Sequence, residues 1–93
     1  MATDVADIWR HCFQQWPQDV ERRGVLVTTF DQIPFDGFAA SDELLLVERR
    51  VPDTVGARMI MVPYAKIEGI KIVDVLKFKA FQSLGFTAPP GRK

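Results

Sequence analysis

The chain has 93 residues, of which 47% are apolar and 26% charged, which is the composition of an ordinary globular domain. A chain this short forms one domain with a thin core, so association with further copies is a natural source of stability. Twelve basic and twelve acidic side chains cancel, which argues against a dedicated DNA-binding protein. One cysteine excludes an internal disulfide, and no signal-peptide pattern or bilayer-spanning apolar run is present. We therefore expect a cytoplasmic protein that does not contact membranes.

The charges are distributed unevenly along the chain. Residues 1–46 carry eight acids and three bases, and the remaining residues carry four acids and nine bases. This asymmetry permits charge complementarity between copies that associate head to tail.

The first predicted element is an amphipathic helix over residues 4–16, with Thr3 or Asp4 as its N-cap. Its apolar residues recur at helical spacing and share one face: Val5, Ile8, Trp9, Cys12, Phe13 and Trp16. Pro17 disfavours helical backbone at Trp16, so we expect the helix to end there.

Trp9, Phe13 and Trp16 form an aromatic stripe on this helix that is too large to leave in water. We expect the stripe to pack on the open end of a small β-barrel formed by the rest of the chain. Docking of a partner protein on the same stripe is the alternative.

Residues 24–75 are predicted to form five short strands separated by turns, because β-branched and apolar runs alternate there with turn residues. The strands are expected at residues 25–30, 33–40, 44–51, 58–62 and 67–75. Gly37 predicts a bend within the second strand, and residues 64–66 predict a tight link, such as one turn of 3₁₀ helix. Residues 76–85 fit either a short helix or a continued strand, and residues 86–93 are expected to form a flexible tail.

Three segments of this region resemble the Sm-like barrel family: VLVTTF, FDGFAASDELLLVER and MIMVPYAKIEGIKI. They are similar to the family's first strand, to its bent second strand with the Asp-containing turn and third strand, and to its last strand pair. The link from Tyr64 to Ile67 is similar in placement to that of the Hfq-type bacterial branch. The predicted fold class is mostly β (α+β), with an N-terminal helix before a strongly bent five-stranded antiparallel SH3-like or Sm-like barrel in a single domain, residues 1–93.

The resemblance implies a homo-oligomer, for example a ring, in which the fourth strand of one copy pairs with the fifth strand of the next. The predicted interface residues are Met59 and Met61 on the fourth strand and Ile70 and Ile72 on the fifth. A physical reason supports the same expectation, because an apolar, unpaired strand edge is usually covered or joined to a partner.

The resemblance also implies RNA as a partner, bound at the turn after the second strand and at the link before the fifth. The matching residues are Asp42, Tyr64 and Lys66. The sequence departs from the family's pattern at the turn, where Glu43 and leucines replace the aromatic that stacks a base and the asparagine that bonds it. A structural or regulatory protein-interaction domain without nucleic-acid binding therefore stays as the alternative.

We find no catalytic constellation, and we expect neither a cofactor nor a metal site. Neighbouring helix residues such as His11 and Cys12 point about 100° apart and do not face each other. One histidine and one cysteine do not supply a zinc ligand set, and Asp42 and Glu43 fit a solvated turn better than acid–base chemistry. A small-ligand site near Tyr64 is a remote third possibility.

Overall fold

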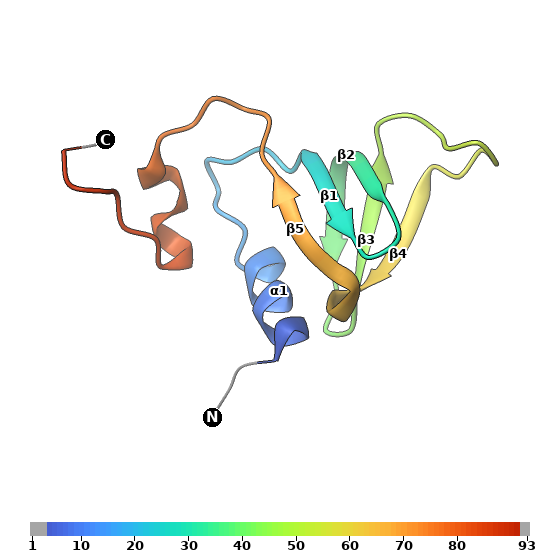
Figure 1. The fold of residues 1–93 in the computed structure, drawn as a ribbon, viewed down its shortest axis with the longest axis horizontal. Coiled ribbons are helices and arrows are strands. Elements are labelled where there is room, and N and C mark those ends of the chain that lie inside the picture. Colours follow the sequence, from blue (N-terminus) through green and yellow to red (C-terminus); the bar gives the residue numbers. More distant parts are fainter. Residues whose placement is uncertain (1–3, 92–93) are drawn as a thin grey trace.

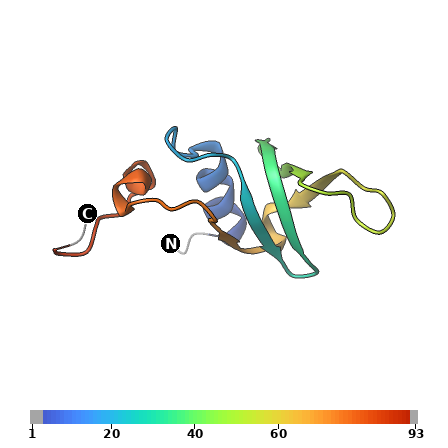
Figure 2. The same ribbon diagram turned by 90° about the horizontal axis from the view of Figure 1, so that it is seen from above.

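The computed structural model describes residues 4–91, so Thr3 and the last two residues of the predicted tail lie outside the described residues. It consists of a helix, α1, beside a five-stranded antiparallel sheet, followed by a separate 3₁₀ helix, η2 (Figure 1). Seen from above, α1 again lies between the sheet and η2 (Figure 2). The helix and the antiparallel sheet that the sequence predicts are confirmed.

Helix α1 spans Val5–Gln14. Asp4 has an extended backbone, and its carboxylate accepts a hydrogen bond from the Ala6 N–H at 3.2 Å, as an N-cap does. The helix ends two residues before the predicted Trp16. Trp16 lies beyond the helix, and its indole N–H donates to the Val20 carbonyl at 2.9 Å, which holds the connection to the sheet.

The five strands follow one another in the order β4-β3-β2-β1-β5 across the sheet. Their bounds are β1 Gly24–Thr28, β2 Gln32–Ala40, β3 Leu44–Arg49, β4 Met59–Pro63 and β5 Ile67–Lys71. The 3₁₀ helix η1, Tyr64–Lys66, links β4 to β5 where the sequence predicts a tight link. Residues 76–85, for which helix and strand both stayed open, contain the 3₁₀ helix η2, Phe78–Leu84.

Glycines mark two irregular positions in the sheet. The register between β2 and β3 shifts between Phe35 and Gly37, where the sequence predicts a bend. At Gly24, the first residue of β1, a Cβ atom would lie 2.4 Å from the Lys71 carbonyl oxygen. Only glycine therefore lets β1 and β5 approach this closely.

The sheet is not closed into the barrel that the sequence predicts. In the described part of the chain, β4 pairs with β3 and β5 pairs with β1, and no ladder joins β4 to β5. The link η1 carries the chain from one edge strand to the other, and α1 packs against η1 and β2 at this end of the molecule. Apolar side chains from α1 thus provide burial that strand closure would otherwise supply.

Phe13 is the central side chain of this packing. It is fully buried, and its ring centroid lies 4.9 Å from that of Phe38, 5.7 Å from that of Trp16 and 6.4 Å from that of Tyr64. The contact with Phe38 is edge-on, a favourable arrangement for two aromatic rings. The aromatic stripe of α1 therefore packs on the domain itself, with Trp9 and Trp16 half-buried around Phe13.

We expect Phe13→Ala to lower the free energy of unfolding by about 3–5 kcal/mol, because it removes a fully buried ring and leaves a cavity. Urea denaturation followed by circular dichroism measures the change. Ile8→Ala is the matched control, since Ile8 lies on the same helix but is half exposed, and it should change stability far less. Equal effects of the two substitutions would contradict the assigned role of Phe13.

Candidate functional site

The four predicted interface residues lie on or next to the two edge strands of the sheet, β4 and β5. Met59 and Met61 on β4 are 54% and 68% exposed. Ile70 on β5 and Ile72, just beyond its end, are half-buried and line an apolar cavity between β5, α1 and η2. The structure therefore brings each pair together within one edge but keeps the two pairs apart within one molecule.

The two methionines belong to a wider apolar surface on the outer side of β3 and β4. Ala39, Leu46 and Met61 lie opposite one another in the register of β2, β3 and β4, and Leu44 lies beside them along a shallow groove of about 250 Å³. We call this surface the outer face; it consists of Ala39, Leu44, Leu46, Met59 and Met61.

The opposite side of the same strands supplies core residues, among them Leu45, Val47 and Val62, which are at most 1% exposed. Strands β3 and β4 are thus apolar on both sides, although α1 and the core cover only one. The leucine run at residues 44–46 is a sequence signal for two apolar sides, because leucines stand at positions that face both sides of the strand.

Asp42 and its turn are tied to α1. The Asp42 carboxylate accepts a hydrogen bond from the Gln14 side-chain amide at 3.0 Å, and the Asp42 carbonyl accepts one from Arg10 Nε at 2.9 Å. The Gln14 amide also lies 3.3 Å from the Ser41 carbonyl. These contacts give the turn a structural role in holding the N-terminal helix.

Tyr64 is a core residue, with only 2% of its surface exposed. Its hydroxyl donates a hydrogen bond to the Ser41 carbonyl at 2.6 Å, and burial raises its pKa above the ordinary value. A ring buried in this way has no free side on which a base could stack. Of the three predicted RNA-binding residues, Lys66 alone has an exposed and uncommitted side chain.

An exposed aromatic that the sequence analysis did not single out lies close to this link. Phe30, in the turn between β1 and β2, is 63% exposed, and the neighbouring Thr29 N–H donates to the Lys66 carbonyl at 3.0 Å. The turn and the link therefore lie side by side. Phe30 was missed because it was assigned to the strand, whereas β1 ends at Thr28 and a hydrogen-bonded turn follows.

His11 and Cys12 form no reactive pair in the structure. His11 is exposed, and Cys12 is half-buried along the apolar cavity, where burial raises its thiol pKa and so disfavours the thiolate. Within residues 4–91, no three histidine, cysteine or acidic side chains gather where they could hold a metal ion. None of the helices in that range is long and apolar enough to cross a membrane.

Comparisons of this chain with models of protein families, with curated proteins and with solved structures found no match. The resemblance to Sm-like proteins therefore stays a prediction from the three sequence segments.

The chain contains a single tyrosine, so its ultraviolet titration reports Tyr64 alone. We expect a midpoint above 10 in the folded protein and a return to about 10 in denaturant, because burial disfavours the phenolate. A raised folded-state pKa contributes stability that is complete below pH 10 and is lost as the pH rises through the folded value.

Tyr64→Phe is the control for this titration, since it removes the absorbance change and this part of the alkaline destabilisation. An ordinary midpoint in the folded protein would contradict the burial of Tyr64.

Proposed function

We propose that this chain is a non-enzymatic, homo-oligomeric module of Sm-like type, in which β4 of one copy pairs with β5 of the next. The observation that supports the proposal is the position of two unpaired edges at opposite ends of one open sheet. Each edge strand has five residues and antiparallel neighbours, so the two edges are matched in length.

The composition of the β4 edge supports the same arrangement. An exposed edge strand normally carries charges, prolines or a bulge that prevent pairing with other chains. Strand β4 carries no charged residue from Met59 to Pro63, and its only proline is the last residue. Strand β4 therefore lacks the features that would prevent pairing with another chain. A second copy would form hydrogen bonds with the backbone N–H and C=O groups along its unpaired edge.

Pairing of two different edges generates a head-to-tail contact, which closes into a ring or continues as a filament. The uneven charge along the chain is compatible with such a contact, since each copy would offer two different surfaces. The work of the protein would then be assembly and the presentation of surfaces to other proteins.

RNA binding is the second candidate function, and it has an observation of its own. Phe30 and Lys66 are both exposed and come from adjacent segments of the chain. An exposed aromatic ring can stack on an unpaired base, and a nearby lysine can neutralise its phosphate. Assembly is the leading proposal because Asp42 and Tyr64 are engaged in structural contacts.

We expect Met61→Asp to dissociate the assembly, because it places a charge on the apolar joining edge. Size-exclusion chromatography with light scattering measures the change as a fall in solution mass to that of one chain, 10.6 kDa. Val55→Asp is the matched control, since it adds the same charge at an apolar residue that is 86% exposed in the β3–β4 loop, and its mass should equal the wild-type value. An unchanged mass for Met61→Asp would count against this interface.

Filter binding of oligo-U and oligo-A across a salt series separates the two candidate functions. If RNA is bound, the affinity should fall steeply with salt, and Lys66→Gln should reduce the slope by about one unit of log affinity per log salt. Lys79→Gln, which removes the same charge from η2, should leave the slope unchanged. Absence of retention at low salt would remove the RNA candidate and leave assembly as the function.

A further inference from the structure

The segment that follows β5, residues 72–91, extends away from the sheet on the far side of α1 (Figure 1). We call it the C-terminal arm. Several of its apolar side chains are exposed: Val73 by 53%, Val75 completely and Phe86 by 60%. The helix η2 within the arm contains no buried residue. The arm therefore leaves several large apolar side chains exposed in one molecule.

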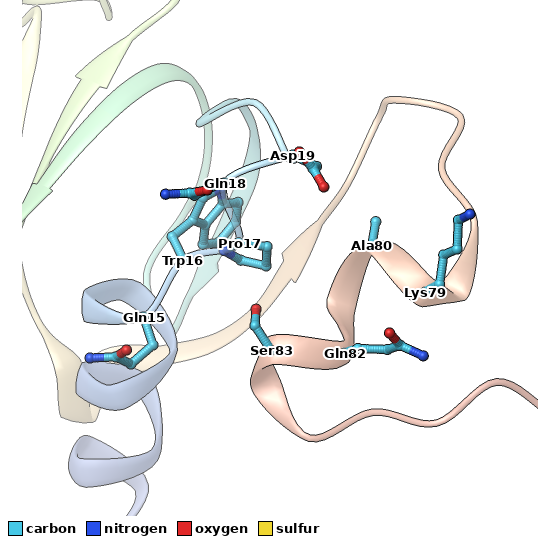
Figure 3. Close-up of a pocket in the computed structure, with 9 residues that line it drawn as sticks. All are labelled: Gln15, Trp16, Pro17, Gln18, Asp19, Lys79, Ala80, Gln82 and Ser83. Atoms are coloured by element: carbon cyan, nitrogen blue, oxygen red, sulfur yellow. The ribbon is translucent and has the colours of Figure 1, made fainter.

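Clefts lie between helix η2 of the arm and the rest of the molecule. A cleft of about 520 Å³ lies between η2 and the connection from α1 to β1, with Trp16 and Pro17 on one side and Ala80 and Ser83 on the other (Figure 3). A second, apolar cavity of about 260 Å³ separates η2 from α1 and β5. The ion pair between Asp74 and Arg23, at 2.7 Å, holds the start of the arm. Beyond Asp74, helix η2 makes few contacts with α1 and the strands.

A matching apolar surface is present on the same chain but out of reach of its own arm. The outer face lies over β3 and β4, whereas the arm begins at β5, four strand spacings away across the sheet. The two edges meet at one end through the three-residue link η1, but the arm starts at the other end of β5 and extends away from β4 rather than across the sheet (Figure 1, Figure 2). In a head-to-tail assembly, by contrast, β4 of the next copy lies beside β5, where the arm starts.

The charges of the two surfaces are also complementary. Lys77 and Lys79 of the arm are exposed, as are Glu43 and Glu48 at the two ends of the outer face. Within the described residues, none of these four side chains belongs to an ion pair. Contacts between the arm and the outer face would pair charges of opposite sign.

Edge pairing alone gives a small interface. Strands of five residues form few cross-strand pairs, and these pairs must offset the translational and rotational freedom that is lost on association. A stable assembly therefore needs further apolar contacts beside the joined edges. The arm and the outer face are suitably placed to supply them.

We propose that the C-terminal arm of one copy packs on the outer face of the next copy and acts as the second half of the assembly interface. This inference rests on the proposed pairing of β4 with β5. Each copy gives one arm and receives one, so the contact repeats at every interface.

The test compares Phe86→Ser with Ile8→Ser by analytical ultracentrifugation over a range of concentrations. Both side chains are large, apolar and similarly exposed, at 60% and 51%, but only Phe86 belongs to the arm. We expect Phe86→Ser to weaken self-association by about tenfold or more and Ile8→Ser to leave it unchanged. Equal affinities for wild type and Phe86→Ser would overturn the inference, as would equal weakening by both variants.

Disulfide trapping gives a second, independent measurement in chains that carry Cys12→Ser. A chain with Val75→Cys is mixed with a chain that carries Met61→Cys, and we expect a disulfide-linked heterodimer under mild oxidation. Val55→Cys replaces Met61→Cys in the control mixture, because Val55 is exposed but lies outside the outer face. Equal cross-linking in the two mixtures would contradict the arm contact.

These measurements also separate the inference from the proposal on which it rests. A wild-type chain that stays monomeric at all concentrations would overturn both. A wild-type chain that assembles, is dissociated by Met61→Asp and is unaffected by Phe86→Ser would overturn the arm contact alone.

Discussion

The ring of Phe13 fills the space that an open sheet leaves between its diverging strands, and much of the structure depends on this contact. The ring is fully buried and packs near aromatic side chains from β2, from η1 and from the connection that follows α1. A five-stranded sheet of this size would otherwise have to close on itself to bury its apolar side. Because α1 supplies the missing apolar side chain, β4 and β5 can both stay at the edges without exposing the core.

This arrangement has a consequence for assembly. An open sheet with a covered core retains two unpaired edges, whereas a closed barrel would have none. The edges lie at opposite ends of the sheet and differ in sequence, so a contact between them joins different surfaces of identical copies. Such contacts propagate, and the angle between successive copies decides between a closed ring and an open filament. The packing of α1 and the proposed self-association are thus linked by the same sheet geometry.

The sequence was most informative where local patterns and tertiary contacts agree. The apolar stripe predicted α1 and its buried face. The turn residues predicted where successive strands are separated, including the tight link at Tyr64–Lys66. The open form of the sheet could not be read in the same way, because it depends on the position of Phe13 relative to Phe38, which are far apart in sequence. Likewise, the need for glycine at position 24 arises from the approach of Lys71 in a distant strand.

The candidate RNA site shows that a residue can stand where a similar family has a binding residue and still have a structural role. Tyr64 occupies the link where a stacking residue is expected, but its hydroxyl bonds the Ser41 carbonyl and its ring packs near Phe13. To expose the ring, the protein would have to break that hydrogen bond and open the core beside α1. The nearby turn carries an aromatic side chain, Phe30, that is already exposed to solvent. Any base stacking at this end of the molecule would therefore use Phe30, and Tyr64 would remain the side chain that holds η1 against the turn after β2.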